Sequence, residues 1–180
     1  MIIWLNGPHG IGKTTTAGLL AERIDGARIF DPEHVGFILR PTLSEVRPVP
    51  DFREWRPWRE LVARAATSIH ATLAELRADA VLVMPQTVPE QQFWHEIRAE
   101  IDAAGIELVH ITLVADVDEH RRRIAGDTVE APAVAEGRAA KIAMFRASLG
   151  WLEQESTVID STGLTPDQVV DQVSRVARPS

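Results

Sequence analysis

The sequence of 180 residues contains no cysteine, which excludes disulfide bonds and thiolate chemistry. This composition suits a reducing cytoplasm, where we expect the protein to reside. No apolar run approaches the roughly 20 residues that a membrane-spanning helix requires. The first residues predict a core strand and not a cleavable signal. We therefore expect a soluble protein without an integral membrane segment.

The chain also lacks an excess of positive charge. Its 19 Lys and Arg residues face 26 Asp and Glu residues, which gives a net charge of −7. Such a chain has no overall basic field to hold a nucleic-acid backbone, so nucleic acid is not expected as a partner. The six histidines show no metal-ligand spacing. The length and the absence of repeats favour one domain over residues 1–180.

The most informative stretch present is Gly7-Pro8-His9-Gly10-Ile11-Gly12-Lys13-Thr14. It fits the phosphate-binding pattern G-x-x-x-x-G-K-[ST] at every fixed position. An apolar strand over 2–5 precedes it, and helical spacing over 13–24 follows it. Glycines let successive N–H groups converge, and the new helix adds the positive end of its dipole. We predict that ATP binds here, through Gly7, Pro8, His9, Gly10, Ile11, Gly12, Lys13, Thr14 and Thr15.

Two side chains of this loop have predicted roles in handling phosphate. Lys13 would reach the β- and γ-phosphates of the nucleotide as a point charge. The Thr14 hydroxyl would be a ligand of Mg²⁺. ATP and magnesium are therefore the expected cofactors.

Strands and helices alternate along the rest of the chain. Apolar runs predict strands over 2–5, 27–30, 80–84, 107–114 and 157–160, and helical spacing predicts helices between them. The pattern is typical of an α/β fold, a five-stranded parallel sheet with helices on both faces. The longest predicted helix runs from Trp58 to about Ala78.

Local signals predict where several of the helices begin and end. Thr87-Val88-Pro89-Glu90 and Asp116-Val117-Asp118-Glu119 have the spacing of capping boxes. Thr165-Pro166 opens the last helix, and Gly150 is expected to cap a helix over about 138–149. The three prolines between 41 and 51 predict an irregular, mobile segment, and residues 126–137 lack periodicity.

Ligands of parallel α/β sheets bind outside the carboxyl ends of the strands. Besides the phosphate-binding loop, this rule selects residues after the other four strands. They are expected to surround one crevice: Asp31, Gln86, Thr87, Asp116 and Asp160.

Beyond the phosphate-binding loop, the segment Phe30-Asp31-Pro32-Glu33-His34-Val35-Gly36-Phe37-Ile38-Leu39-Arg40 resembles the ATP-binding tunicamycin resistance proteins. Trp58-Arg59 and Val83-Met84-Pro85-Gln86-Thr87 resemble the same family. The resemblance implies a P-loop phosphotransferase of the nucleoside monophosphate kinase-like type, with strand order 2-3-1-4-5, ATP and Mg²⁺. It also implies an acceptor lobe over about 31–78 and a moving, Arg-bearing lid over about 121–138.

Asp31 is the predicted catalytic carboxylate. At the end of the second strand it could accept a proton from a substrate hydroxyl or hold Mg²⁺ through water. A role in capping the next helix is the alternative, and both can hold at once. Glu33 adds a second carboxylate, which the helix dipole would favour in any case. The third strand ends in Met84-Pro85-Gln86 and supplies no metal-holding Asp.

Arginine and tryptophan side chains supply the remaining candidates. Arg123 is the predicted lid arginine, which would neutralise phosphate or stack on adenine, while Arg121 and Arg122 are equally explained as a solvated helix face. Trp58 fits the core, whereas Trp55 is freer to bind a ligand. The predicted substrate-binding residues are Asp31, Arg40, Trp55, Arg59 and Gln86, and Arg56 is a weaker candidate.

Three functions fit this sequence. The first is an ATP-dependent phosphotransferase acting on a hydroxyl of a small nucleoside-like compound, with tunicamycin implied by the resemblance. The second is a nucleoside or nucleotide kinase. The third is an ATP-dependent binding protein that sequesters tunicamycin without catalysis, an alternative that the missing Asp of the third strand keeps open.

Overall fold

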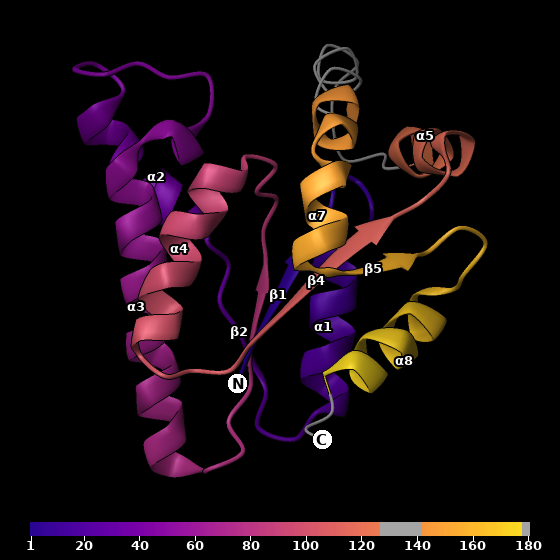
Figure 1. The fold of residues 1–180 in the computed structure, drawn as a ribbon, viewed down its shortest axis with the longest axis horizontal. Coiled ribbons are helices and arrows are strands. Elements are labelled where there is room, and N and C mark those ends of the chain that lie inside the picture. The colour runs from indigo at the N-terminus through magenta and orange to yellow at the C-terminus, as the bar shows by residue number, and fades with distance from the viewer. Residues whose placement is uncertain (127–141, 178–180) are drawn as a thin grey trace.

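The computed structural model describes residues 1–126 and 142–177. Its centre is one parallel sheet with the strand order β2-β3-β1-β4-β5 (Figure 1). The predicted fold class and strand order are therefore confirmed. The strands are β1 (Ile2–Asn6), β2 (Arg28–Ile29), β3 (Leu82–Pro85), β4 (Leu108–Val114) and β5 (Thr157–Asp160).

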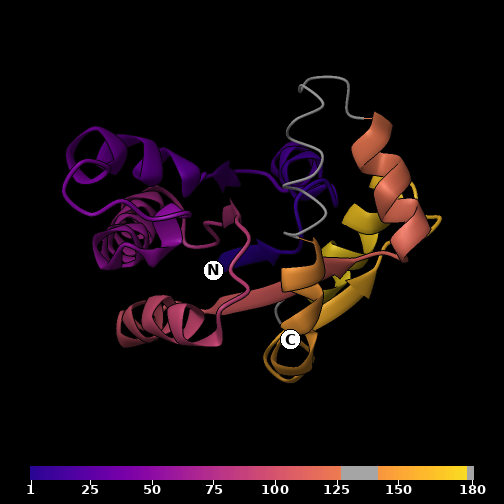
Figure 2. The ribbon, with the colours of Figure 1, turned by 90° about the horizontal axis from the view of Figure 1, so that it is seen from above.

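Helices cover both faces of the sheet. In two perpendicular views, α2, α3 and α4 gather on one side of the molecule, and α5 and α8 lie on the other (Figures 1 and 2). None of the helices within 1–126 and 142–177 is long and apolar enough to cross a membrane. The elements are α1 (Lys13–Arg23), α2 (Glu33–Leu43), the 3-10 turn η1 (Phe52–Glu54), α3 (Arg56–Leu76), α4 (Gln91–Ala103), α5 (Val117–Gly126), α7 (Leu149–Glu155) and α8 (Pro166–Val176).

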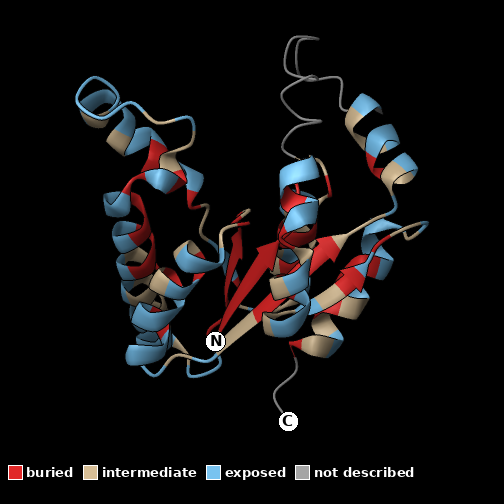
Figure 3. Cartoon of the chain, turned by 45° about the horizontal axis from the view of Figure 1, so that its top comes forward, coloured by how far each residue is buried: buried red, intermediate tan, exposed pale blue. Residues whose placement is uncertain are grey.

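The core has two parts, one on each face of the sheet. Every residue of β1 is buried, as expected of a central parallel strand covered on both faces (Figure 3). Ile3 and Leu5 pack toward α1 and α8, whereas Ile2 and Trp4 pack toward α3 and α4. Trp58 is fully buried in the second part, which confirms that it belongs to the core.

The helix α2 is longer than the sequence predicts. It continues through Pro41 to Leu43, into the segment that the prolines between 41 and 51 predict to be irregular. Pro41 lacks an N–H group, so the carbonyl of Phe37 loses its helical donor. The proline stands only two residues before the end of α2, so the helix loses one hydrogen bond in its last turn and is not interrupted.

Two predicted helix ends are wrong. Thr87 does not cap α4, which begins four residues later after Glu90; the hydroxyl of Thr87 instead donates to the carbonyl of Gly7 at 2.6 Å. Gly150 lies inside α7 and does not end a helix. Of the helix predicted over 138–149, residues 142–147 are helical and 138–141 lie outside the described residues.

The capping predictions for α5 and α8 are supported. The backbone N–H of Glu119 donates to Asp116 Oδ1 at 2.7 Å at the start of α5. Thr165 and Gln168 form a reciprocal capping box at the start of α8. Both interactions satisfy N–H groups that the first helical turn leaves unpaired.

A histidine on β4 joins the sheet to its covering helices. The ring of His110 stacks on Trp94 of α4, with centroids 3.8 Å apart. Its Nδ1 lies 3.1 Å from the carbonyl oxygen of Glu155, which can only accept, so Nδ1 carries the proton. Nε2 then accepts from the Asn6 amide at 3.3 Å. Burial lowers the pKa of His110 to about 4.

We predict that acid destabilises the fold through His110. Its pKa rises from about 4 in the folded chain to 6.5 when unfolded. The unfolded chain therefore binds more protons below pH 6.5, and stability falls as the pH drops from 6.5 toward 4. The loss between pH 7 and pH 5 is about 2 kcal/mol. Urea titrations of wild type and His110→Gln at both pH values measure it. An equal pH dependence in both proteins would contradict the assignment.

Candidate active site

The loop between β1 and α1 has the backbone that phosphate binding requires. Gly7, Gly10 and Gly12 have φ values of 145°, 74° and 105°, which side chains larger than glycine rarely adopt. Gly12 leads directly into α1, and no acidic residue occupies the first turn of that helix. The positive end of the helix dipole therefore faces the loop without a competing charge.

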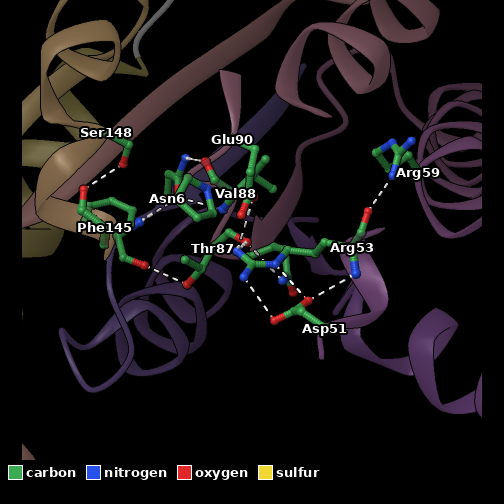
Figure 4. A network of polar contacts seen from close by, with 12 residues as sticks. Asn6, Asp51, Arg53, Arg59, Thr87, Val88, Glu90, Phe145 and Ser148 are labelled. Carbon is green, nitrogen blue, oxygen red and sulfur yellow. Dashed lines mark hydrogen bonds and ion pairs between the residues drawn. The ribbon is translucent and has the colours of Figure 1, made fainter. Parts of the chain in front are cut away.

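Polar contacts from β1 and β3 hold the start of this loop. Asn6 Oδ1 accepts the N–H groups of Gly7 at 2.9 Å and Val88 at 3.0 Å. Figure 4 shows Asn6 beside Val88 and Thr87, with Arg53 reaching Thr87. Arg53 donates to the Thr87 carbonyl at 2.9 Å. Residues from three separate stretches of the first half of the sequence thus fix where the loop begins.

Lys13 is folded back onto its own loop. Its Nζ donates to the carbonyl oxygens of Gly7 and Pro8, each at 3.0 Å. Burial lowers the pKa of Lys13 to about 8, with Arg53 acting in the same direction and Glu33 and Asp31 opposing it. The ammonium group is therefore held at the loop in a site that favours its charge less than water does.

An open cavity of about 490 Å³ lies over the loop. It brings together predicted residues from distant parts of the chain: most of the predicted nucleotide-binding residues of the loop, Asp31 after β2, and Arg123 of α5. Gly7, Pro8 and Ile11 of the loop do not line it. Asp116, Asp160, Gln86 and Thr87 do not line it. The lining residues are His9, Gly10, Gly12, Lys13, Thr14, Thr15, Asp31, Glu33, Pro85 and Arg123.

A second cavity of about 240 Å³ adjoins the first. The two share Gly12, Thr15 and Arg123 in their linings. Its walls are more apolar, because they include Ile11 of the loop together with residues of the β5–α8 connection and α8, namely Leu164, Pro166 and Val169. A polar cavity and a more apolar one thus lie on either side of three shared residues.

Two carboxylates at the start of α2 line the cavity together with Lys13. Asp31 Oδ1 accepts the backbone N–H of Glu33 at 2.9 Å, so the carboxylate also stabilises the beginning of α2. Glu33 lines the same cavity, and its charge raises the pKa of Lys13 more than the charge of Asp31 does. A functional role of Glu33 stays a hypothesis.

The oxygen atoms of the cavity suit a magnesium ion. Thr14, Asp31 and Glu33 line it together, and hydroxyl and carboxylate oxygens are the ligands that Mg²⁺ prefers. Within the part of the chain that the structure describes, no group of three or more His, Cys, Asp or Glu side chains forms a metal cage. A site of this kind fits an ion that also takes water and phosphate oxygens as ligands.

The four other predicted substrate-binding residues lie outside the cavity. Arg40 is exposed on α2 with its guanidinium 5.6 Å from the Phe37 ring centroid. Trp55 is only 4% exposed and donates to the Arg47 carbonyl, so its ring belongs to the core. Gln86 is also 4% exposed, with a buried Oε1 that has no partner among the described residues. The role of Trp55 in binding a ligand stays a prediction.

Arg59 is a structural residue in this arrangement. It pairs with Glu96 Oε2 at 2.6 Å, and its guanidinium lies 4.1 Å from the centroid of the Phe93 ring. It also donates to the carbonyl of Arg53. These contacts join α3 to α4 and leave Arg59 buried, and its role in binding substrate stays a prediction.

Arg123 lies where the two cavities meet. It donates to the Ile11 carbonyl at 3.2 Å and to the Ser161 carbonyl at 2.7 Å, and it pairs with Glu119. Residues 127–138, which make up most of the predicted lid, lie outside the described residues. Arg121 and Arg122 are exposed, with carboxylate partners on α5, as expected of a solvated helix face.

The strand order and the loop after β1 give this chain the fold of the P-loop kinases. Shikimate kinase from Aquifex aeolicus has this fold, with a TM-score of 0.63 at 15% identity over 98% of this chain and 95% of that chain. The APS kinase of Mycobacterium tuberculosis in complex with AMPPNP and APS also has this fold, with a TM-score of 0.59 at 16% identity. The match covers 97% of this chain and 95% of that chain.

The predicted resemblance is also confirmed. The chain is similar to the tunicamycin resistance protein of Deinococcus radiodurans, with a TM-score of 0.71 and 28% identity. The match covers 99% of this chain and 96% of that one. No family model and no curated protein sequence matches the chain.

We predict that Lys13→Ala weakens Mg-ATP binding roughly 10- to 100-fold, because that is the affinity lost with one charge-assisted hydrogen bond. Isothermal titration calorimetry measures the change. The ammonium group of Lys13 is held by the carbonyl oxygens of the buried residues Gly7 and Pro8, and residues 7–15 contain no second Lys or Arg. An unchanged Mg-ATP affinity in the variant would refute the prediction that ATP binds at the loop over 7–15.

We further predict that Mg-ATP affinity depends on the charge of Lys13. Its pKa is about 8 in the free protein, and bound phosphate would raise it, because an opposite charge favours the ammonium form. Affinity is then greatest below pH 8 and falls by up to about tenfold per pH unit above it. Calorimetry between pH 7.5 and 9.5 tests this, and Lys13→Ala should show no such slope.

Proposed function

We propose that this protein is an ATP-dependent phosphotransferase that acts on a hydroxyl group of a small nucleoside-like molecule. The observation that carries the proposal is the cavity of about 490 Å³, which has Lys13 and Thr14 on one side and Asp31 and Glu33 on the other. Phosphate-binding groups and two carboxylates thus share one space, as transfer of a phosphoryl group to a hydroxyl requires.

The nucleotide would lie across both cavities. Its phosphates would occupy the polar compartment over the loop, where backbone N–H groups and Lys13 neutralise their charge. Its base would enter the apolar compartment beside Leu164 and Val169. Arg123 stands between the two compartments and could contact either the phosphates or the base.

The acceptor would approach from the side of Asp31 and Glu33. We assign Asp31 the role of general base that takes the proton of the attacking hydroxyl. Thr14 would hold Mg²⁺ together with water and carboxylate oxygens. The bound ion would neutralise charge on the β- and γ-phosphates during transfer. Because such an enzyme consumes ATP, we propose that it works in the cytoplasm.

Tunicamycin is the proposed acceptor or ligand. Support comes from the similarity to the Deinococcus radiodurans protein, whose name states tunicamycin resistance, over 99% of this chain. The proposal therefore includes a role in resistance to this antibiotic. Sequestration without catalysis is the second candidate, favoured by Pro85, Gln86 and Thr87 at the end of β3, where no carboxylate is available to hold a metal.

We predict that Asp31→Asn slows phosphoryl transfer about 10²- to 10⁴-fold with little change in Mg-ATP affinity. The asparagine retains the Oδ1 that accepts the Glu33 N–H, so α2 should still form. Mass spectrometry of tunicamycin and a panel of nucleosides, incubated with protein and Mg-ATP, detects the product. Calorimetry measures the nucleotide affinity.

Two matched variants make this experiment specific. Asp116→Asn alters a carboxylate that likewise accepts a backbone N–H at a helix start but does not line the cavity, and it should leave transfer unchanged. Glu33→Gln tests the neighbouring carboxylate. If Glu33→Gln abolishes transfer while Asp31→Asn does not, Glu33 is the base. If wild type forms no product yet binds Mg-ATP and tunicamycin, sequestration replaces catalysis.

A further inference from the structure

The helix α5 contacts three consecutive residues of the phosphate-binding loop. His120 Nε2 lies 2.7 Å from the carbonyl oxygen of His9. Arg123 donates to the carbonyl oxygen of Ile11 at 3.2 Å. Between them, Ile124 packs so closely on Gly10 that a Cβ atom there would lie 2.7 Å from Ile124 Cγ1. One face of α5 therefore covers the outer side of the loop.

The contact between His120 and His9 fixes the chemical form of the ring. A carbonyl oxygen only accepts hydrogen bonds, so Nε2 of His120 must carry a proton and donate it. The ring is buried at the packed side of α5. Burial lowers the pKa of His120, the hydrogen bond to His9 opposes this, and the positive charges of Arg123, Lys13 and Arg146 lower the pKa further. At neutral pH the ring is therefore the neutral Nε2–H tautomer.

Because the peptide bond is planar, a hydrogen bond to a carbonyl on the outer side of the loop also fixes the direction of the next N–H on its inner side. In a trans peptide the carbonyl oxygen and the N–H of the next residue point in opposite directions. The carbonyl of His9 points toward α5, so the N–H of Gly10 points away from it. The same holds for the carbonyl of Ile11 and the N–H of Gly12. Gly10 and Gly12 both line the cavity over the loop.

The helix α5 is itself firmly attached. Asp116 Oδ1 accepts the N–H of Glu119 at its start, and the N–H of Asp116 donates to Thr162 Oγ1 at 2.8 Å. Arg123 donates to the Ser161 carbonyl at 2.7 Å and to Ser161 Oγ at 2.9 Å. The connection after β5 thus supports α5, and α5 in turn supports the loop.

We propose that His120 is a positioning residue of the nucleotide site, which orients the His9–Gly10 peptide so that its N–H faces the bound phosphates. The role rests on the nucleotide binding proposed above. Arg123 does the same for the Ile11–Gly12 peptide, and Ile124 keeps the loop from moving toward α5. His120 touches neither phosphate nor substrate, and it acts only through the backbone of the loop.

The experiment compares two substitutions of His120. His120→Phe keeps a ring but cannot donate, whereas His120→Gln keeps an N–H donor. Calorimetry should show that His120→Phe has about tenfold lower affinity for Mg-ATP and Mg-ADP, which is the effect of one lost hydrogen bond. The affinities of His120→Gln should lie within about threefold of those of wild type. His95→Phe is the matched control, because His95 is exposed and contacts Glu155 on α7, away from the loop.

A spectroscopic readout in the absence of nucleotide separates this role from a general loss of stability. The ¹⁵N chemical shift of an amide responds to hydrogen bonding at the preceding carbonyl. The ¹⁵N chemical shift of the Gly10 amide should therefore change in His120→Phe and return toward the wild-type value in His120→Gln. The ¹⁵N shift of Gly12 should change less, because Arg123 and not His120 donates to the preceding carbonyl of Ile11. Thermal unfolding confirms that each variant is folded. If phenylalanine disrupts α5, the smaller His120→Leu removes the donor instead.

The outcomes distinguish this inference from the proposed function. If wild type binds Mg-ATP and His120→Phe binds it equally well, the positioning role is overturned while nucleotide binding stands. If His120→Gln is as weak as His120→Phe and Gly10 does not recover, the packing of the ring matters and the hydrogen bond does not, which also overturns it. If wild type fails to bind Mg-ATP, the proposed function is wrong and His120 has no nucleotide site to position.

Discussion

The buried amide of Asn6 is the interaction on which the rest of the site depends. Its oxygen accepts the N–H groups of Gly7 and Val88, and its nitrogen donates to the Val88 carbonyl and to His110. Every hydrogen-bonding position of this side chain is thereby used, although the residue is fully buried. A buried polar group left unpaired is costly, whereas a fully paired network is rigid. The phosphate-binding loop therefore starts from a fixed point at the end of β1.

The segment over 31–78 is attached to the same point through Thr87. Arg53 pairs with Asp51 within this segment and donates to the Thr87 carbonyl, while the Thr87 hydroxyl donates to Gly7. A shift of the segment would therefore displace the first residue of the loop. Arg59 and Trp55, two of the predicted substrate-binding residues, are buried in contacts with other parts of the segment and with α4.

The parts of the structure that sequence reasoning predicted well are those specified by neighbouring residues. The loop pattern, the apolar strands and the Thr165 cap each depend on a few consecutive positions. The roles of Arg53, Arg59 and Thr87 depend on partners up to 80 residues away, which local spacing cannot reveal. Whether the ring of Trp55 is covered likewise depends on the fold of residues 31–78, which neighbouring positions do not reveal. The sequence does place Glu33 two residues after Asp31, and the structure shows both in the lining of one cavity.

The position of Lys13 has a kinetic consequence. Its ammonium group is already out of bulk water and is solvated by two carbonyl oxygens of its own loop. A phosphate that arrives must replace those oxygens, so binding is an exchange of partners and not a simple gain of an ion pair from water. Association should then proceed in two steps: a rapid encounter with the backbone N–H groups, and a slower one in which the side chain of Lys13 leaves the loop carbonyls and turns to the anion.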